Sequence, residues 1–282
     1  MNIVNSTIAV GDGLNTFRVT QALINKFLEN GQQAIEIHWY NGDLGSLFPA
    51  EKYGAVNILN SRPIEADISI SYHEHVLGRS DTDRSMDFSA AMSTKYGLNL
   101  EGIVPELNTP FIPDIPDFDF VIAPYVLNNP SKNPGPAFYQ SLVDALKEKY
   151  PNYSIGIVGK GSMPSDEDLL KVEYSIERFK DPEYIRINTT QYLTGVDYFW
   201  DKSLQEVAQL LKNTKRLFIT PDSGLRWLNT FIKKESVELY TQPHCLISSH
   251  FRDYHDNLRE EQKTPITLEQ TMQFIQKALY SL

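Results

Sequence analysis

The stretch Lys215–Thr230, KRLFITPDSGLRWLNT, decides the fold of this chain. The β-branched and aromatic residues of Arg216–Thr220 predict a short buried strand, which Pro221 ends. Asp222–Gly224 then predicts a tight turn, and the apolar residues after it have helical spacing. A strand, a turn and a helix N-terminus in this order bring free backbone N–H groups to the positive end of the helix dipole. Such a place suits an anionic group such as a phosphate.

The turn has two interpretations. Gly224 carries no side chain, so an anionic group could approach the backbone closely there. Asp222 or Ser223 could equally cap the helix without any ligand. The residues of this stretch by themselves leave both interpretations open.

The composition limits the kind of protein. The 282 residues are 41% hydrophobic and 22% charged, which favours one large or two ordinary folded domains over disorder. The formal net charge of −10 disfavours general binding to nucleic acid or acidic lipid. The single cysteine, Cys245, excludes an internal disulfide. Because no signal-peptide pattern and no run of about 20 apolar residues is present, we expect a cytoplasmic protein that is not transmembrane.

A proline-rich connector separates two stretches in which strands and helices alternate. Pro105–Phe120 contains four prolines and is expected to be extended. We therefore predict an α/β fold with a first Rossmann-like domain over residues 1–117 and a second over 118–264. Residues 265–282 are predicted to form a terminal helix that packs back across the boundary. The two domains are expected to face each other across a cleft.

The first half opens with a predicted strand, a glycine turn and a helix. Ile8–Val10 ends the strand, Gly11–Leu14 forms the turn, and Phe17–Leu28 is the helix. Asp12 lies in this turn at the carboxyl end of a strand, where open α/β sheets bind their ligands. It is a candidate general base, although an ordinary turn or N-cap aspartate gives the same pattern.

A second polar group follows the predicted strand Asp67–Ser71. In an extended chain His73 and His75 point the same way, with Glu74 between them. A metal site needs further ligands, and no third one is evident. A loop that lines a cleft, or a surface loop without a function, is therefore expected, and no metal is assigned.

The second half alternates in the same way. Besides the strand of the opening stretch, strands are predicted at Asp119–Tyr125, Ser154–Val158, Ile185–Ile187 and Val237–Tyr240. Helices are predicted at Ala137–Lys149, at Ser203–Leu211 with Ser203 as its N-cap, and at Thr267–Tyr280.

Five stretches, taken in order, resemble glycosyltransferase family 9, the lipopolysaccharide heptosyltransferase family, which has the GT-B fold. They are Gly11–Thr16, Ser85–Leu98, Ser131-Lys132 with Pro136–Tyr139, Leu193–Gly195 with Ser203–Leu211, and Asp222–Leu225. The resemblance implies two Rossmann-like domains facing across a cleft. It also implies an inverting glycosyltransferase that needs no metal or other cofactor.

The resemblance assigns roles to individual residues. Asp12 matches the family's turn aspartate, the general base, and Lys132 matches the lysine that holds donor phosphate. The family usually has a histidine where this chain has Trp227. The implied donor-binding residues are Lys132, Asp222, Ser223, Gly224, Leu225 and Trp227. The acceptor-side candidates are Asn15, His73, Glu74 and His75.

The implied partners are a nucleoside-diphosphate sugar as donor and a glycan, a lipid-linked or another hydroxyl compound as acceptor. The net charge disfavours modified nucleic acid as the acceptor. Two other interpretations remain. A sugar-nucleotide epimerase or hydrolase of the same fold would have an extra acid in the cleft. A non-catalytic protein that binds sugar nucleotides would not need both Asp12 and Lys132.

Overall fold

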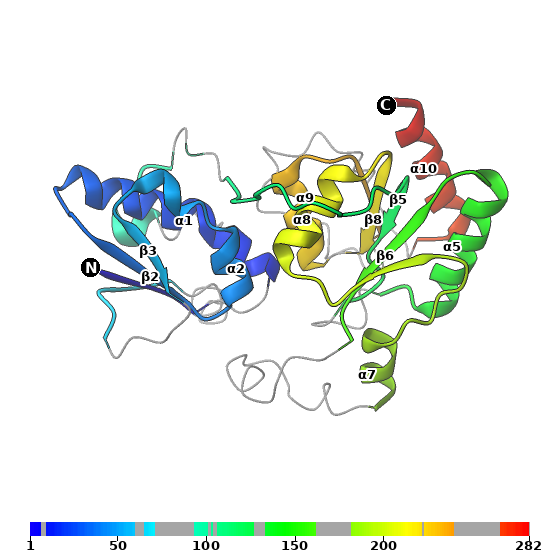
Figure 1. Ribbon diagram of the computed structural model, residues 1–282, viewed down its shortest axis with the longest axis horizontal. Helices are drawn as coiled ribbons and strands as arrows, with labels where there is room; N and C mark the ends of the chain where they lie inside the picture. Colours follow the sequence, from blue (N-terminus) through cyan, green and yellow to red (C-terminus); the bar gives the residue numbers. More distant parts are fainter. Residues whose placement is uncertain are drawn as a thin grey trace. The chain divides into compact units, whose positions relative to one another are not determined.

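The computed structural model describes residues 1–6, 10–59, 65–70, 93–100, 103, 106–126, 133–161, 182–221, 223–239 and 266–281, without the side chains of 12, 15, 183, 184 and 281. The chain divides into two compact units, Met1–Pro110 and Phe111–Leu282. Each unit has its own parallel sheet with helices between the strands, which confirms the α/β fold class (Figure 1).

The first unit is built on a four-stranded sheet with the order β3-β2-β1-β4. The strands are β1 (Asn2–Asn5), β2 (Ile35–Trp39), β3 (Val56–Leu59) and β4 (Ile68–Ile70), and all pair in parallel. Helix α1 (Val10–Glu29) connects β1 to β2, and α2 (Gly42–Leu47) with the short 3-10 helix η1 (Ala50–Tyr53) connects β2 to β3.

The core of the first unit lies between α1 and the sheet. Its fully buried apolar side chains include Ile3, Leu14, Phe17, Leu23, Ile35, Ile37 and Ile70. Away from this core, α1 binds residues 93–100: Lys26 Nζ donates to Tyr96 O at 2.6 Å, and Arg18 Nη2 donates to Leu100 O at 2.8 Å. Two positively charged side chains of α1 therefore hold residues 93–100 to this helix.

The second unit is built on a five-stranded parallel sheet with the order β7-β6-β5-β8-β9. The strands are β5 (Phe120–Ile122), β6 (Ile155–Gly159), β7 (Asp197–Trp200), β8 (Leu217–Pro221) and β9 (Ser236–Leu239). The helices are α5 (Pro136–Lys149), α7 (Pro182–Thr189), α8 (Leu204–Asn213), α9 (Gly224–Ile232) and α10 (Leu268–Ser281). Figure 1 shows α5 and α10 on one face of the sheet and α8 and α9 on the other.

Terminal helix α10 packs on elements of the second unit. It contacts α5, β8 and β9, and its side chains Ile275 and Ala278 are buried in the same apolar cluster as Leu142 and Ile219. These contacts account for the amphipathic spacing of the helix. Packing of α10 back across the boundary stays a prediction.

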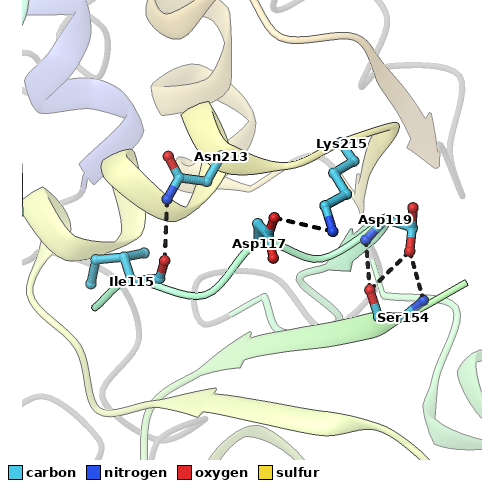
Figure 2. Close-up of polar contacts among 6 residues, drawn as sticks. All are labelled: Ile115, Asp117, Asp119, Ser154, Asn213 and Lys215. Atoms are coloured by element: carbon cyan, nitrogen blue, oxygen red, sulfur yellow. Dashed lines mark hydrogen bonds and ion pairs between the residues drawn. The ribbon is translucent and has the colours of Figure 1, made fainter. Parts of the chain in front are cut away.

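The connector before β5 is held by hydrogen bonds and an ion pair (Figure 2). Asn213 Nδ2 donates to Ile115 O at 3.2 Å, and Lys215 Nζ lies 3.1 Å from Asp117 Oδ2. Asp119 and Ser154 bond reciprocally, because Asp119 N donates to Ser154 Oγ at 3.0 Å and Ser154 N donates to Asp119 Oδ2 at 2.9 Å. These contacts lie at the amino ends of β5, β6 and β8, opposite the carboxyl edge of this sheet.

Two predicted elements of the first unit are wrong. The strand is Asn2–Asn5 instead of one ending at Ile8–Val10, and Gly11–Leu14 forms the first turn of α1 instead of a glycine turn. The glycine at 13 has a packing role, because a Cβ there would overlap the Leu44 side chain of α2. The glycine at this position therefore lets α1 and α2 approach closely. From the sequence alone, the same glycine suggested a turn.

The predicted strand Ile185–Ile187 is also wrong, because these residues lie in α7. A short alternation of apolar residues cannot distinguish a strand from one side of a short helix, and Pro182 provides a helix start. Strand β7, which the sequence did not predict, occupies the sheet edge next to β6 instead.

Candidate functional site

The topology of the second sheet defines where a ligand can bind. From β5 the chain continues to β6 and β7 on one side, and then returns to place β8 on the other side of β5. The strand order therefore reverses between β5 and β8. Open α/β sheets bind ligands outside the carboxyl ends of the strands at such a switch point. At this edge Ala123 N donates to Ile219 O at 2.9 Å, directly before the loops that follow the two strands.

Helix α9 starts immediately after β8 at the switch point. Its N-cap, Ser223, is extended and makes no side-chain hydrogen bond to the helix. The Ser223 hydroxyl instead lies 3.0 Å from Thr220 Oγ1. The positive end of this helix is thus not neutralised by the Ser223 side chain, and Ser223, Gly224 and Leu225 are all partly exposed there.

Helix α5 follows β5 and has the same property. Its N-cap, Gly135, has φ +95° and no side chain that could cap the helix, and Pro136 occupies the first turn. Asn133 fixes the preceding loop, because its Nδ2 donates to Pro124 O at 2.9 Å and its Oδ1 accepts from Gly135 N at 2.9 Å. The chain neighbour of Lys132 is therefore held at the carboxyl end of β5. Lys132 itself and Asp222 lie outside the described residues.

A buried ion pair supports α9, and the sequence did not predict it. Arg226 Nη1 lies 3.5 Å from Glu238 Oε2 on β9, and the two side chains are 1% and 7% exposed. The Arg226 guanidinium also lies 4.4 Å from the centre of the Trp227 ring. Trp227, expected among the donor-binding residues, is buried at 7% exposure.

The first sheet has a switch point of the same kind. β1 lies between β2 and β4, and its carboxyl end is joined to that of β4 by Ser6 N, which donates to Ile70 O at 3.1 Å. α1, with Asp12 and Asn15 in its first turns, follows β1, and the segment with His73–His75 follows β4. The topology therefore brings both groups of candidates after neighbouring strands. The side chains of Asp12 and Asn15, and the whole of His73–His75, lie outside the described residues.

Tyrosines gather beside α5 near the carboxyl end of β5. Tyr125 OH donates to Thr190 O at 3.0 Å, and its ring contacts Tyr192 with centroids 5.7 Å apart. Burial raises the pKa of Tyr125, Tyr139 and Tyr192 above the ordinary value of 10.0, and neighbouring tyrosines raise it further. These phenols remain protonated at neutral pH, so they can donate hydrogen bonds but cannot act as bases.

The Leu193–Gly195 segment, part of the resemblance, docks on α5. Thr194 N donates to Gln140 Oε1 at 2.9 Å, and Gly195 has φ +73°. Leu193 N donates to the Tyr198 hydroxyl at 2.7 Å. These contacts are structural, since they hold the approach to β7 against the helix.

The described part of the chain shows neither a cluster of metal ligands nor a membrane-spanning helix. Within the ranges that the structure describes, no group of three or more His, Cys, Asp or Glu side chains could hold a metal ion. None of the described helices has the length and apolar character needed to cross a membrane.

Comparison with solved structures shows the fold. Neither the protein-family models nor the curated proteins contain a match. The chain is similar to the iron-containing dodecameric glycosyltransferase TibC from enterotoxigenic E. coli H10407, at 18% identity and TM-score 0.60 over 99% of this chain and 76% of TibC. It is also similar to E. coli heptosyltransferase WaaC with ADP, at 11% identity and TM-score 0.56 over 98% of this chain and 97% of WaaC. A third similar structure is the glycosyltransferase family 9 protein from Veillonella parvula DSM 2008, at 14% identity and TM-score 0.55 over 100% of this chain and 97% of that protein. The chain thus has the fold of these glycosyltransferases.

Proposed function

We propose that this protein is a metal-independent, inverting glycosyltransferase that moves a sugar from a nucleoside-diphosphate sugar to a hydroxyl acceptor in the cytoplasm. The observation that carries the proposal is the fold, which at least 98% of the chain shares with heptosyltransferases. One of these, WaaC, is seen with ADP and with ADP-2-deoxy-2-fluoro heptose, which supports a nucleoside-diphosphate sugar as the donor class.

The donor site in this proposal is the switch point of the second sheet. Breaking the bond between the anomeric carbon and the diphosphate oxygen builds negative charge on the leaving group. The N-termini of α9 and α5, with no side-chain cap from Ser223 or Gly135, supply N–H groups and dipoles that can stabilise this charge. Lys132, next to the fixed Asn133, would add a full positive charge. Asp222 and Trp227 complete the proposed donor-binding set.

The acceptor site belongs to the first unit in this proposal. Asp12 takes the proton from the acceptor hydroxyl. The oxygen of that hydroxyl attacks the anomeric carbon from the side opposite the diphosphate, which inverts the carbon. Asn15 and the segment His73–His75 would contact the acceptor. A glycan or a lipid-linked compound fits this chemistry equally well.

The experiment combines donor identification with one substitution. A thermal-shift screen with ADP, UDP, GDP, CDP and their sugars identifies the donor, because a ligand that binds only the folded chain raises the Tm. Release of the nucleoside diphosphate from that donor, with soluble sugars or water as acceptor, then measures turnover. Asp12→Asn is expected to lower turnover about 10²–10⁴-fold while donor affinity is unchanged.

Two kinds of outcome would contradict the proposal: a failure of the assigned residues to matter, and a dependence of turnover on a metal ion. Near-normal turnover of Asp12→Asn would remove Asp12 from the mechanism, and the absence of any nucleotide that raises the Tm would remove the donor site. Because TibC is described as iron-containing, the wild-type chain is also assayed after treatment with EDTA. Unchanged turnover is expected, and a loss that iron restores would contradict metal independence.

A further inference from the structure

Two polar side chains are completely buried between β1 and α1. Asn5, the last residue of β1, and Thr16 of α1 are both 0% exposed, as are Ile3, Leu14 and Phe17 nearby in the chain. Asn5 Nδ2 donates to Thr16 Oγ1 at 2.6 Å, and Thr16 Oγ1 donates to Gly13 O at 2.6 Å. These bonds form a short chain from the end of a strand to the first turn of a helix.

Asn5 is a fixed point in this chain of bonds. Its backbone lies in register with Trp39 on β2 and with Ile70 on β4, so both sides of the residue are paired in the sheet. It also marks the carboxyl end of β1 at the switch point of the first sheet. The hydrogen bond to Thr16 therefore ties α1 to the carboxyl end of β1.

Thr16 follows Asp12 by four residues in the same helix, so the two positions share one face of α1 and are one turn apart. A buried hydrogen bond is directional, so it adds a constraint on the rotation of the helix about its axis beyond that from apolar packing. A rotation of about 20° would move an atom about 5 Å from the helix axis by roughly 2 Å. Misplacement of a catalytic group by about 1 Å can lower a rate about 10²-fold.

We infer that Asn5 and Thr16 are positioning residues for Asp12, because their hydrogen bonds set the rotation and depth of the first turn of α1 against the edge of the sheet. This inference rests on the proposed function, since it gives Asp12 the role of base. Stability alone does not require the pair, because apolar groups of the same shape can replace two buried hydrogen-bond partners at little cost.

The test uses Thr16→Val, which keeps the shape of the side chain and removes the hydroxyl. We expect kcat to fall at least about 10-fold while affinity for the donor, which binds the other unit, is unchanged. Thr16→Ser restores the hydroxyl and is expected to recover turnover to within about 3-fold of wild type. Thr20→Val is the matched control. Thr20 is also 0% exposed, and its hydroxyl donates only within the helix, to Thr16 O at 2.9 Å.

A double-mutant cycle with Asp12→Asn separates a positioning role from a structural one. If Thr16 acts through Asp12, then Thr16→Val causes little further loss in the Asp12→Asn background. Equal losses in Thr16→Val and Thr20→Val, or a Thr16→Val loss that persists in full without Asp12, would overturn the inference.

The same assay keeps the two proposals apart. If Thr16→Val turns over at the wild-type rate while Asp12→Asn shows a large loss, the positioning role is overturned and the proposed function is unaffected. Absence of turnover in the wild-type chain, or an Asp12→Asn variant with normal turnover, overturns the proposed function and the positioning role with it.

Discussion

Arg226 and Glu238 carry opposite charges into the interior of the second unit. The pair connects the first turn of α9 to β9. Removing a charge from water is costly, and the partner charge offsets this cost only while both are present. We therefore expect the pair to hold the N-terminus of α9 in place more than it adds net stability.

We expect Glu238→Leu to lower the free energy of unfolding by about 3–5 kcal/mol, because Arg226 would remain buried without its carboxylate. The double variant Glu238→Leu/Arg226→Met is expected to recover most of this loss, since a well-packed apolar pair avoids the desolvation cost. Urea unfolding of the two variants and the wild type measures both effects. A Glu238→Leu variant within about 1 kcal/mol of the wild type would contradict this role.

Among the elements, α8 and α9 start in different ways. Ser203 and Glu206 form a capping box at the start of α8: Ser203 Oγ accepts from Glu206 N at 3.2 Å, and Ser203 N donates to Glu206 Oε2 at 2.9 Å. Helix α9 has Ser223 at the same position without such a bond. The helix at the proposed ligand site thus lacks the side-chain cap that the other helix has.

This difference predicts unequal effects of the same substitution. Ser203→Ala is expected to lower the free energy of unfolding by about 0.5–2 kcal/mol, the usual cost of losing an N-cap. Ser223→Ala, the matched comparison, is expected to cost less than Ser203→Ala, because it removes the hydrogen bond to Thr220 but no cap. Thermal or urea unfolding checks both, and an equal cost for the two serines would contradict the assignment.

The cap also predicts a dependence on pH. The backbone N–H of Ser203 lowers the pKa of Glu206 below its ordinary 4.5, with smaller contributions from the Ser203 hydroxyl and Lys202. A lowered pKa gives stability that is present above pH 4.5 and is lost as the pH falls through the lowered value. The stability difference between wild type and Glu206→Gln should therefore shrink below pH 4.5.

At the scale of the whole molecule, the two units each contain a sheet and a core. The second unit buries both faces of its sheet with its own helices, and its apolar cluster draws on β5, β6, β8, β9, α5 and α10. All residues of the proposed donor site also belong to residues 111–282. Nucleotide binding should therefore depend on this unit alone.

We expect residues 111–282 to fold cooperatively by themselves and to bind the donor nucleotide within about 10-fold of the affinity of the full chain. Lys132→Ala in this fragment is expected to weaken diphosphate binding by about 1.5–3 kcal/mol, the scale of a hydrogen bond to a charged group. Calorimetry on the fragment and its variant measures both. A folded fragment that binds no nucleoside diphosphate, or a Lys132→Ala variant with full affinity, would contradict the placement of the site.

The sequence by itself predicted the elements whose signals are local. The strand and helix of the opening stretch are β8 and α9, and Ser203 caps α8 as expected. A β-branched run, a capping serine and helical spacing act within a few residues, so they can be recognised without a tertiary structure. The α/β class followed from the alternation of such elements.

Only the tertiary structure decided how these elements meet. Strand β7 is held by pairing with β6 about 40 residues earlier. Its aromatic residues favour a strand locally, but they do not determine which strand it joins. The switch points, the Arg226–Glu238 pair and the bond from Asn5 to Thr16 likewise depend on strand order and on which side of a helix faces the sheet. Hydrophobic periodicity selects that side but not the partner of a buried polar group, because the partner comes from another part of the chain.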